Sequence, residues 1–490
     1  MEGVRSSGWW ILVVAVAVLA AVLSNRFSER TRIPAPAFFL VAAAVASDAV
    51  PALRQFSITT VQNVVTVALV LLLFHGGMEL GWRRLRPEAG PVIWIGVVGT
   101  FLTAGLVACA ARLLGFDWHA ALLLGTAVAP TDPAVVFSVL GGKEITGRTG
   151  VLLQGESGAN DPVGIALMAG LLGASVGSAQ AAAGRVALIF VEQMAIGAAV
   201  GAAGGLGLKW FISKVPLPGE GLYPLRLLAG AFTVYGAAAV AHGSGFLAVF
   251  LAGIVLGDAR APYKREIEHF HTALGSLAEI VAFTMLGLTI PLSSFASQGA
   301  WGDGLVLAGV LAFLARPLVM ALLLVPLRLG AGERVFLAFA GLKGAVPILL
   351  GSFVLSAHLS HSKRIYDVVF VVVALSVIVQ GALVPTVARW CRVSMRSSAV
   401  EPWALGIRLR DRPEGVQRVV VRAGSIADGS AIADLDLGEH VWISFAVREG
   451  RLLAAGGSTR LRPDDELMLL TDPEGPDDWS RMFTERPEQR

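Results

Sequence analysis

The stretch Gln154-Gly155-Glu156-Ser157-Gly158-Ala159-Asn160-Asp161-Pro162 places two acidic side chains inside a segment, 149–174, that is otherwise apolar. An ionised carboxylate at the centre of a lipid bilayer costs about 2.5–3.5 kcal/mol even on insertion scales. If this segment crosses a membrane, both acids must therefore be paired, protonated or hydrated. The rest of the fold must then supply their partners.

Helical spacing sorts the polar side chains of this stretch onto two neighbouring faces. Ser157 and Asp161 are four residues apart and share one face. Glu156 and Asn160 are also four residues apart and share the next face. One face can bind an ion while the other is anchored to a basic residue, and Pro162 frees a backbone carbonyl as a further oxygen ligand. In the alternative interpretation, both acids only form structural salt bridges.

The composition of the whole chain indicates a membrane protein. Of its 490 residues, 55% are apolar and 15% are charged, whereas a soluble domain carries about 25% charged residues. The 36 acidic and 39 basic residues nearly cancel, which excludes nucleic-acid binding by a basic surface. Cys109 and Cys391 are too few and too far apart for a disulfide framework or a zinc site. A soluble enzyme is therefore excluded.

The apolar segments predict an all-α polytopic membrane protein with about 13 transmembrane helices. Each segment is close to the ~20 residues that a helix needs to cross the hydrocarbon core. The predicted spans are 9–24, 34–50, 58–80, 91–114, 118–140, 149–174, 186–211, 225–241, 243–258, 272–296, 301–325, 333–357 and 366–390.

The distribution of Lys and Arg predicts the orientation of these spans. One set of alternate connecting loops holds about 19 basic residues and the other set about six. Because cytoplasmic loops retain positive charge, the N-terminus is expected outside and the C-terminus in the cytoplasm. The first span resembles a signal peptide, but its cleavage would leave Arg26, Arg30 and Arg32 outside. We therefore interpret it as a helix, in the inner membrane of a cell.

The chain changes character after Arg396, where it becomes polar and charged. Short apolar runs at Val416–Val421, Val441–Val447 and Glu466–Leu470 predict strands, and Ser425–Leu437 is interpreted as a short helix. We therefore predict a membrane domain at 1–396, a small cytoplasmic α+β domain at 405–475 and a disordered tail at 476–490.

Two spans contain prolines and small residues where a continuous helix is expected. The fifth contains Pro130-Thr131-Asp132-Pro133, and the twelfth contains Gly341-Leu342-Lys343-Gly344-Ala345-Val346-Pro347. Proline interrupts a helix, and interrupted membrane helices are typical of ion sites in transporters. Their spacing predicts two inverted repeats with crossed broken helices, in which Asp132 and Lys343 offset the dipoles of the half-helix ends. Alternatively, Asp132 only caps a helix, and Lys343 only extends to the membrane surface.

Two deep basic residues need partners from other helices. Neither Arg316, in Ala315-Arg316-Pro317, nor Lys343 has an acidic neighbour at helical spacing in its own span. A buried charge without a partner is strongly destabilising, so each is expected to find a counter-charge elsewhere in the fold.

The membrane part resembles the monovalent cation:proton antiporter-1 family, which includes sodium/proton and potassium/proton antiporters. The resemblance covers nearly all of this part and rests on five motifs. These are Thr131-Asp132-Pro133, Glu156–Asp161, Gly245–Gly253, Ala315-Arg316-Pro317 and Gly341–Gly344.

The resemblance implies roles for individual residues. Asp161 alternately carries a proton or a monovalent cation, and Thr131 and Ser157 complete the metal-ion site, with Asp132 beside it. Glu156, Asn160, Arg316 and Lys343 form the supporting polar network. The Asn160-Asp161 pair implies electroneutral exchange, and the family implies a homodimer. A proton gradient drives such exchange, so neither ATP nor a redox cofactor is expected.

His75 and Glu279 occupy positions that are often acidic in similar proteins. Histidine titrates near neutrality, so His75 is a candidate for pH sensitivity or cation preference, unless it is a plain interfacial side chain. Glu279 is interpreted only as a buried polar contact.

The tail looks like the C-terminal half of a regulator-of-potassium-conductance module, RCK-C or TrkA-C, beginning near Val416. No Gly-x-Gly-x-x-Gly segment follows a strand before it, so the usual nucleotide-binding half is absent, although the tail itself can take a small-molecule or nucleotide ligand. Antiporters with such a tail are similar to the potassium/proton group. We therefore predict exchange of cytoplasmic potassium for external protons.

Three alternative functions compete with potassium/proton exchange. The first is sodium/proton exchange by the same site. The second is a gated cation channel, which lacks support because the chain has no Thr-Val-Gly-Tyr-Gly filter segment. The third is a sensor that has lost transport, which would have no need to retain the costly Asp161.

Overall fold

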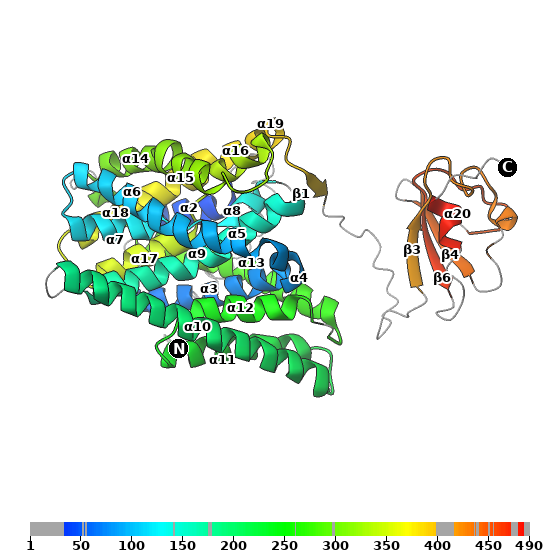
Figure 1. Cartoon of the computed structure of the whole chain (residues 1–490), viewed down its shortest axis with the longest axis horizontal. Coiled ribbons are helices and arrows are strands. Elements are labelled where there is room, and N and C mark those ends of the chain that lie inside the picture. The colour runs from blue at the N-terminus through cyan, green and yellow to red at the C-terminus, as the bar shows by residue number, and fades with distance from the viewer. Residues whose placement is uncertain are drawn as a thin grey trace. The chain divides into compact units, whose positions relative to one another are not determined.

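The computed structural model describes two compact units, which divide between Ser398 and Ala399. The described residues are 34–50, 53, 56–140, 143–174, 179–259, 261–295, 299–397, 416–435, 437, 441–448, 451–453, 455–471 and 479–484. The first predicted span, 9–24, lies outside these residues. Figure 1 shows the helical first unit and the sheet of the second.

The first unit is built almost entirely from helices. In chain order these are α2 Ala35–Ala49, α3 Ile58–Leu80, α4 Trp82–Leu85, η2 Arg86–Glu88, α5 Ala89–Ile93, η3 Trp94–Val98, α6 Gly99–Leu113, α7 Trp118–Val128, α8 Pro133–Ser138, α9 Gly147–Gly173, α10 Ala179–Lys214, α11 Leu222–Val240, α12 Gly245–Gly257, α13 Lys264–Leu288, η4 Leu292–Ser294, α14 Ala300–Val310, η5 Leu311–Ala315, α15 Arg316–Leu323, α16 Ala331–Phe339, α17 Ala345–Ser356, α18 Ser362–Leu375, η6 Ser376–Gln380 and α19 Gly381–Trp390. The predicted all-α membrane architecture is therefore confirmed in outline.

Six continuous helical segments in the described part of the chain are long and apolar enough to cross a membrane. They are 58–80, 82–113, 181–214, 264–288, 300–323 and 362–390. Shorter apolar helices occupy 35–49, 118–128, 245–257 and 345–356. Each predicted span from 34–50 onward contains a helix. The number of 13 crossings and the inverted repeats stay predictions.

The two proline-containing spans are interrupted. Helix α7 ends at Val128 and α8 begins at Pro133, while α16 ends at Phe339 and α17 begins at Ala345. The extended backbones of the two breaks meet, because the amide of Asp132 donates a hydrogen bond of 2.8 Å to the carbonyl of Leu342. By contrast, α9 continues through Pro162.

Helix α9 is the centre of the membrane unit. In Figure 1, α14, α15 and α16 lie along one edge of the unit and α10 and α11 along the opposite edge, with α9 between them. Buried residues occur on every face of α9. Helix α10 instead exposes large apolar side chains such as Leu188, Leu206 and Trp210. A helix that is buried all round can hold polar residues away from lipid, whereas the exposed apolar face of α10 suits lipid contact.

Close approach of α3 and α12 depends on two glycines. A Cβ atom on Gly77 would lie 2.4 Å from the carbonyl oxygen of Phe250, and one on Gly253 would lie 2.4 Å from that of Phe74. Small residues let membrane helices pack backbone to backbone. These two helices therefore form a closely packed pair beside α9.

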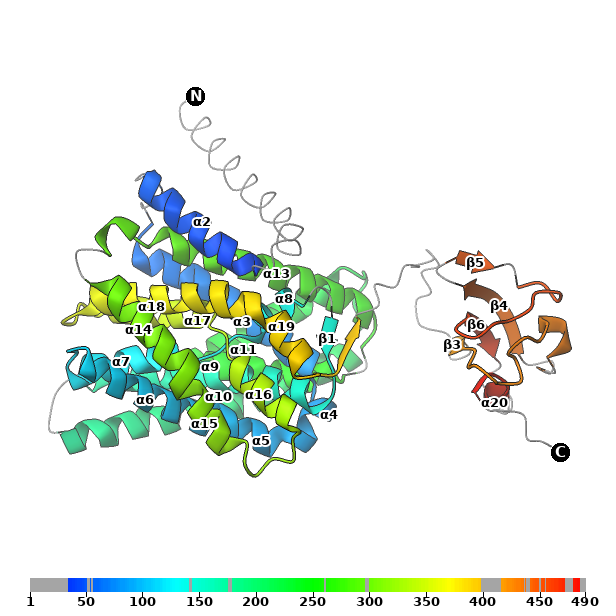
Figure 2. The same ribbon diagram turned by 90° about the horizontal axis from the view of Figure 1, so that it is seen from above.

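A short sheet ties the loop before α9 to the end of the last helix. Strand β1, Lys143–Ile145, pairs antiparallel with β2, Met395–Ser397, so that Lys143 faces Ser397 and Ile145 faces Met395. The amide of Thr146 extends this pairing by a bond of 2.9 Å to the carbonyl of Ser394. Figure 2 shows β1 beside the end of α19. The sequence pattern alone does not predict this sheet.

The second unit contains a four-stranded antiparallel sheet in the order β3-β6-β4-β5. The strands are β3 Val416–Val420, β4 Val441–Arg448, β5 Arg451–Leu453 and β6 Glu466–Thr471. Alternate residues of β6, Leu467 and Leu469, point into a small apolar core. The three predicted strands are therefore present, and β5 forms a hairpin with β4.

Two predictions for the second unit are wrong. Ser425–Leu437 is not an α-helix but a series of turns followed by the 3-10 helix η7, Ile432–Asp434, because Gly424 and Gly429 adopt positive φ angles of 78° and 80°. The predicted disordered tail, 476–490, contains the helix α20, Ser480–Thr484. Trp479 and Phe483, four residues apart, are buried in the core of the sheet, and this apolar face orders the segment.

Candidate ion-binding site

The first helix break is held against α9 by three hydrogen bonds to Thr131. The Ser157 hydroxyl donates to the Thr131 carbonyl over 2.7 Å, and the Asn160 side-chain amide donates to the Thr131 hydroxyl over 2.8 Å. The Asn160 side-chain carbonyl accepts from the Thr131 amide over 3.3 Å. All three residues are buried. The two faces of α9 therefore both contribute to fixing the position of the break.

Asp161 lies one turn beyond Ser157 on the same helix. It is 7% exposed, and its carboxyl makes no hydrogen bond or ion pair with the residues that the structure describes. The charges of Asp132 and Lys343 lie within electrostatic reach of it. A buried carboxyl without a fixed partner needs a proton or a cation to offset its charge.

Glu156 has a fixed partner. Its carboxylate forms a bidentate ion pair with the guanidinium of Arg316. Nη1 donates to Oε1, and Nη2 donates to Oε2 over 2.9 Å. Arg316 also donates to the carbonyl of Leu337 over 3.2 Å. Gly341 makes room for this arrangement, since a Cβ there would lie 2.4 Å from Nε of Arg316. The counter-charge expected for Arg316 thus comes from α9.

Lys343 differs from the expectation, because its partners are carbonyls and not a carboxylate. Its Nζ donates to the carbonyls of Ala129 and Pro130 over 2.8 and 3.0 Å, and the residue is 1% exposed. These carbonyls follow the C-terminal end of α7, where a helix carries partial negative charge. A side chain buried in this way does not extend to the membrane surface.

Asp132 caps the second half of the broken helix. Its Oδ1 accepts a hydrogen bond of 2.9 Å from the amide of Ala134, and Pro133 takes the first helical position. The carboxyl also packs against Gly344, where an added Cβ would lie 2.0 Å from Oδ2. The local contacts of Asp132 are therefore those of a helix cap. Its contact with Gly344 also joins the two helix breaks.

His75 and Glu279 lie outside this cluster of hydrogen bonds. Nε2 of His75 is 3.5 Å from Oε1 of Glu79, one turn further along α3, and its ring packs against Gly275 of α13. Glu279 has a buried Oε1 that makes no hydrogen bond within the described part of the chain. The polar contact expected for that atom is therefore not present.

Sequence reasoning missed two residues that hold the second break. The Ser376 hydroxyl accepts from the amide of Lys343 over 3.2 Å and donates to the side-chain carbonyl of Gln380 over 3.1 Å. The side-chain amide of Gln380 donates in turn to the carbonyl of Phe339. A serine and a glutamine four residues apart in the apolar span 366–390 were the signal that could have identified them.

Comparison with known proteins identifies the family of the chain. Residues 14–390 match the profile of the family described as "Sodium/hydrogen exchanger, transmembrane". The chain belongs to this family, and it is a multi-pass membrane protein that exchanges cations for protons. The resemblance drawn from the sequence motifs is therefore confirmed.

Individual relatives cover most of the chain. It is 34% identical over 389 residues to the K(+)/H(+) antiporter NhaP of Alkalimonas amylolytica, covering 79% of this chain and 67% of that protein. It is 30% identical over 485 residues to the K(+)/H(+) antiporter NhaP2 of Shewanella oneidensis, covering 98% and 84%. The solved sodium proton antiporter MjNhaP1 from Methanocaldococcus jannaschii shares the fold, with a TM-score of 0.65 at 22% identity over 78% of this chain and 100% of that one.

Proposed function

We propose that this antiporter exchanges potassium for protons one for one and that Asp161 carries either ion. The observation that carries the proposal is the contrast between two buried acids on one helix. Glu156 is neutralised by Arg316, whereas the Asp161 carboxyl makes no bond with the described residues. A carboxyl in a low-dielectric setting binds a proton or a cation in competition, and only its neutralised forms are expected to cross between the two sides.

Oxygen atoms near Asp161 provide candidate ligands for the cation. Ser157 and Thr131 bring hydroxyls, and the bonds that Ser157 and Asn160 donate to Thr131 fix the break beside α9. Hydroxyl and carboxylate oxygens suit a monovalent cation that has lost part of its water. We assign Asp132 to the same site and Glu156, Asn160, Arg316 and Lys343 to its support.

The preference for potassium rests on the relatives. Those at 30–34% identity are named potassium/proton antiporters, and one of them matches 98% of this chain, so the similarity extends into the tail. The solved neighbour is named a sodium/proton antiporter, so sodium is the second candidate. In keeping with the family, we place the antiporter in the cell membrane as a homodimer, with its N-terminus outside.

The second unit is proposed to be a cytoplasmic RCK-C-like domain that regulates exchange. Its four antiparallel strands and the apolar core around Leu467 and Phe483 support an independently folded module. Because Trp479 and Phe483 belong to this core, we extend the domain from 405–475 to at least residue 484. A small-molecule or nucleotide ligand is proposed for it.

Transport by purified protein tests this proposal. The protein is reconstituted in liposomes that contain a pH-sensitive dye, and potassium, sodium or lithium is added in turn. Potassium-driven proton movement without a dependence on membrane voltage is expected. A response to sodium alone would show that the exchanged cation is sodium and not potassium. A voltage-dependent response would overturn one-for-one exchange. Identical liposomes with Asp161→Asn protein provide the matched control.

A further inference from the structure

A single wide helical turn holds the second break. Helix α18 passes into α19 through η6, Ser376–Gln380, which is a π-helical turn. Such turns are rare, and they occur frequently at functional sites. At one end of η6, the Ser376 hydroxyl accepts from the Lys343 amide over 3.2 Å. At the other end, the Gln380 side-chain amide donates to the carbonyl of Phe339, the last residue of α16. The turn therefore bonds to the end of α16 and to the break itself.

The two polar side chains of η6 form one unit. The Ser376 hydroxyl donates its proton to the side-chain carbonyl of Gln380 over 3.1 Å. A helical serine can instead give this proton to a carbonyl of its own helix, where it holds nothing outside that helix. Here the bond fixes the orientation of the Gln380 amide, whose nitrogen is then free to donate to α16. Ser376 is 7% exposed, so water has little access to these bonds.

One peptide group links this turn to the first break. The Leu342 carbonyl and the Lys343 amide belong to the same planar trans peptide group, so they point in opposite directions. The amide donates to Ser376, and the carbonyl accepts from the amide of Asp132 over 2.8 Å. Rotation of this peptide group would break both bonds together. The orientation that Ser376 imposes on the second break is therefore passed on to Asp132.

The same residue also joins the breaks through its side chain. The ammonium group of Lys343 donates to the two carbonyls that follow α7, while its amide is held by Ser376. The first break has its own anchors, a serine and an asparagine of α9. Each break is thus held by two polar side chains about one turn apart on a neighbouring helical segment, and the two breaks bond to each other.

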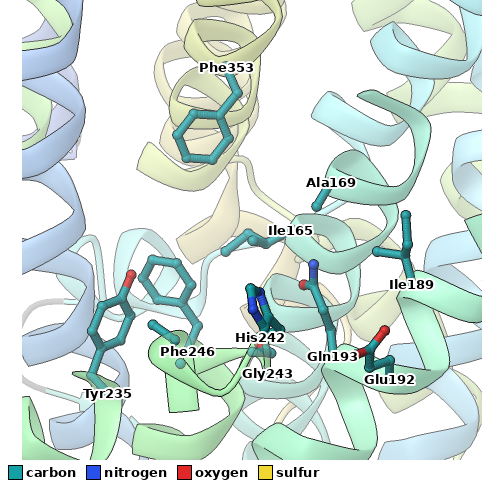
Figure 3. Close-up of a pocket in the computed structure, with 13 residues that line it drawn as sticks. Ile165, Ala169, Ile189, Glu192, Gln193, Tyr235, His242, Gly243, Phe246 and Phe353 are labelled. Carbon is teal, nitrogen blue, oxygen red and sulfur yellow. The ribbon is translucent and has the colours of Figure 1, made fainter. Parts of the chain in front are cut away.

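The turn lies outside the pocket that borders α9. This pocket of about 550 Å³ lies between α9 and α17 on one side and α10, α11 and the start of α12 on the other, and Figure 3 shows the side chains that line it. Neither η6 nor the second break contributes to the described residues of this lining. An effect of the turn on the cation must therefore pass through the bonds of the breaks and not through the pocket.

We propose that Ser376 and Gln380 are positioning residues that act as one unit and, through the second break, set how tightly the ion site holds its cation. This inference rests on the proposed function of Asp161. The charges of Asp132 and Lys343 lie within electrostatic reach of the Asp161 carboxyl. Coulomb interactions in a low-dielectric interior change strongly with distance. A site whose charges are held in place beforehand binds its cation without the cost of ordering them.

Transport kinetics test the role of Ser376. Ser376→Ala removes both bonds of the hydroxyl, so the cation concentration for half-maximal exchange in liposomes is expected to rise about three- to tenfold, the equivalent of about one hydrogen bond. The maximal rate is expected to stay within about a factor of two, because no group that binds the ion is removed. Ser376→Thr keeps the hydroxyl and is expected to restore the wild-type value. Ser362→Ala, at the start of the same helix, is the matched control and should change neither value.

A double-mutant cycle tests whether the two side chains act together. Gln380→Leu alone is expected to raise the half-saturation by a similar factor, because the Ser376 hydroxyl loses its acceptor and α16 loses its donor. The double variant should be no worse than the poorer single variant, since either change already breaks the unit. Single effects that multiply in the double variant would show that the two side chains act separately and would overturn the unit.

Thermal unfolding in detergent separates positioning from a purely structural role. A structural role would lower the unfolding temperature and the maximal rate together and leave the half-saturation unchanged, and that result would overturn the proposal. If the alanine variant does not insert, Ser376→Cys, which keeps the size of the side chain but bonds weakly, takes its place with the same expected rise.

The results also separate this inference from the function on which it rests. If wild-type protein exchanges no cation, the proposed function itself fails. If wild-type protein exchanges cations and Ser376→Ala matches it in both half-saturation and maximal rate, only the positioning role is overturned.

Discussion

The two polar faces of α9 differ in whether their charge is already neutralised. On one face, Glu156 pairs with Arg316 and Asn160 bonds to Thr131. On the other, Ser157 bonds to Thr131, but Asp161 makes no bond with the described residues. Two acids five residues apart on one buried helix thus have different surroundings. The fixed partner of Glu156 suits a structural role, and the lack of one at Asp161 supports the proposal that it carries the transported ion.

The comparison also explains why one helix carries both tasks. A site that alternately loses and gains a charge must be held in place by contacts that do not change with it. The ion pair ties α9 to the helix that begins at Arg316, and the Thr131 bonds tie it to the first break. The position of Asp161 is therefore set by contacts that its own carboxyl does not make.

Removing the unpaired charge of Asp161 is expected to have the largest effect on exchange. Asp161→Asn keeps the size of the side chain but can neither titrate nor carry a cation, so exchange should fall to the level of empty liposomes. The protein should still insert and keep its thermal stability in detergent. Because the acid makes no bond with the described residues, its loss leaves none of them unsatisfied. Cation-driven proton movement at the normal rate in this variant would remove the core of the mechanism.

Breaking the fixed pair is expected to affect stability more than Asp161→Asn does. Glu156→Gln or Arg316→Gln alone leaves one buried charge without its partner, at a cost of about 3–5 kcal/mol. The double change should cost less than the sum of the two single changes. Thermal unfolding of all three variants in one detergent provides the cycle. Simple additivity would show that the pair is not coupled.

The sequence predicted the faces of α9 but not all of their partners. The four-residue spacing of Ser157 and Asp161 follows from helix geometry alone, which is why their shared face was predictable. The partner of Lys343 was not, because backbone carbonyls become available only where another helix has already broken. Strand β1 has three residues and no alternating pattern, so only tertiary contact with β2 defines it. Local sequence patterns therefore predict the helices, whereas the residues that contact one another across helices are known only from the tertiary structure.

Lys343 is intermediate between the paired Glu156 and the unpaired Asp161, because its charge is bonded only to neutral carbonyls. Lys343→Met removes the donor to the carbonyls of Ala129 and Pro130, at an expected cost of about 1–3 kcal/mol. The loss should be smaller than that of Arg316→Gln, because no opposite charge is left behind. Thermal stability in detergent gives the ranking. Lys363→Met, at an exposed position, is the control and should change little.

The tail is expected to have the smallest effect on the ion site. No residue assigned to the site or to its two helix breaks lies beyond Gln380, so truncation after Ser397 should keep the maximal exchange rate within about a factor of two. It should nevertheless change how exchange depends on pH or on a cytoplasmic ligand. A domain that binds a ligand differently in two transporter states must shift their populations. Exchange rates across pH, with oligomeric size in detergent, provide the measurement.

Strand β2 makes this prediction sharper, because it lies between the last helix and the tail. A second truncation, after Ser394, also removes β2 and so frees β1, which leads into α9, while it keeps the Ser394 carbonyl that binds Thr146. If the tail acts through this sheet, both truncations should lose the regulated response, and only the shorter protein should also change its basal rate. If the tail only holds two protomers together, the protein ending at Ser397 should become monomeric with an unchanged pH profile. That result would contradict regulation by the tail and leave the contrast between the two faces of α9 intact.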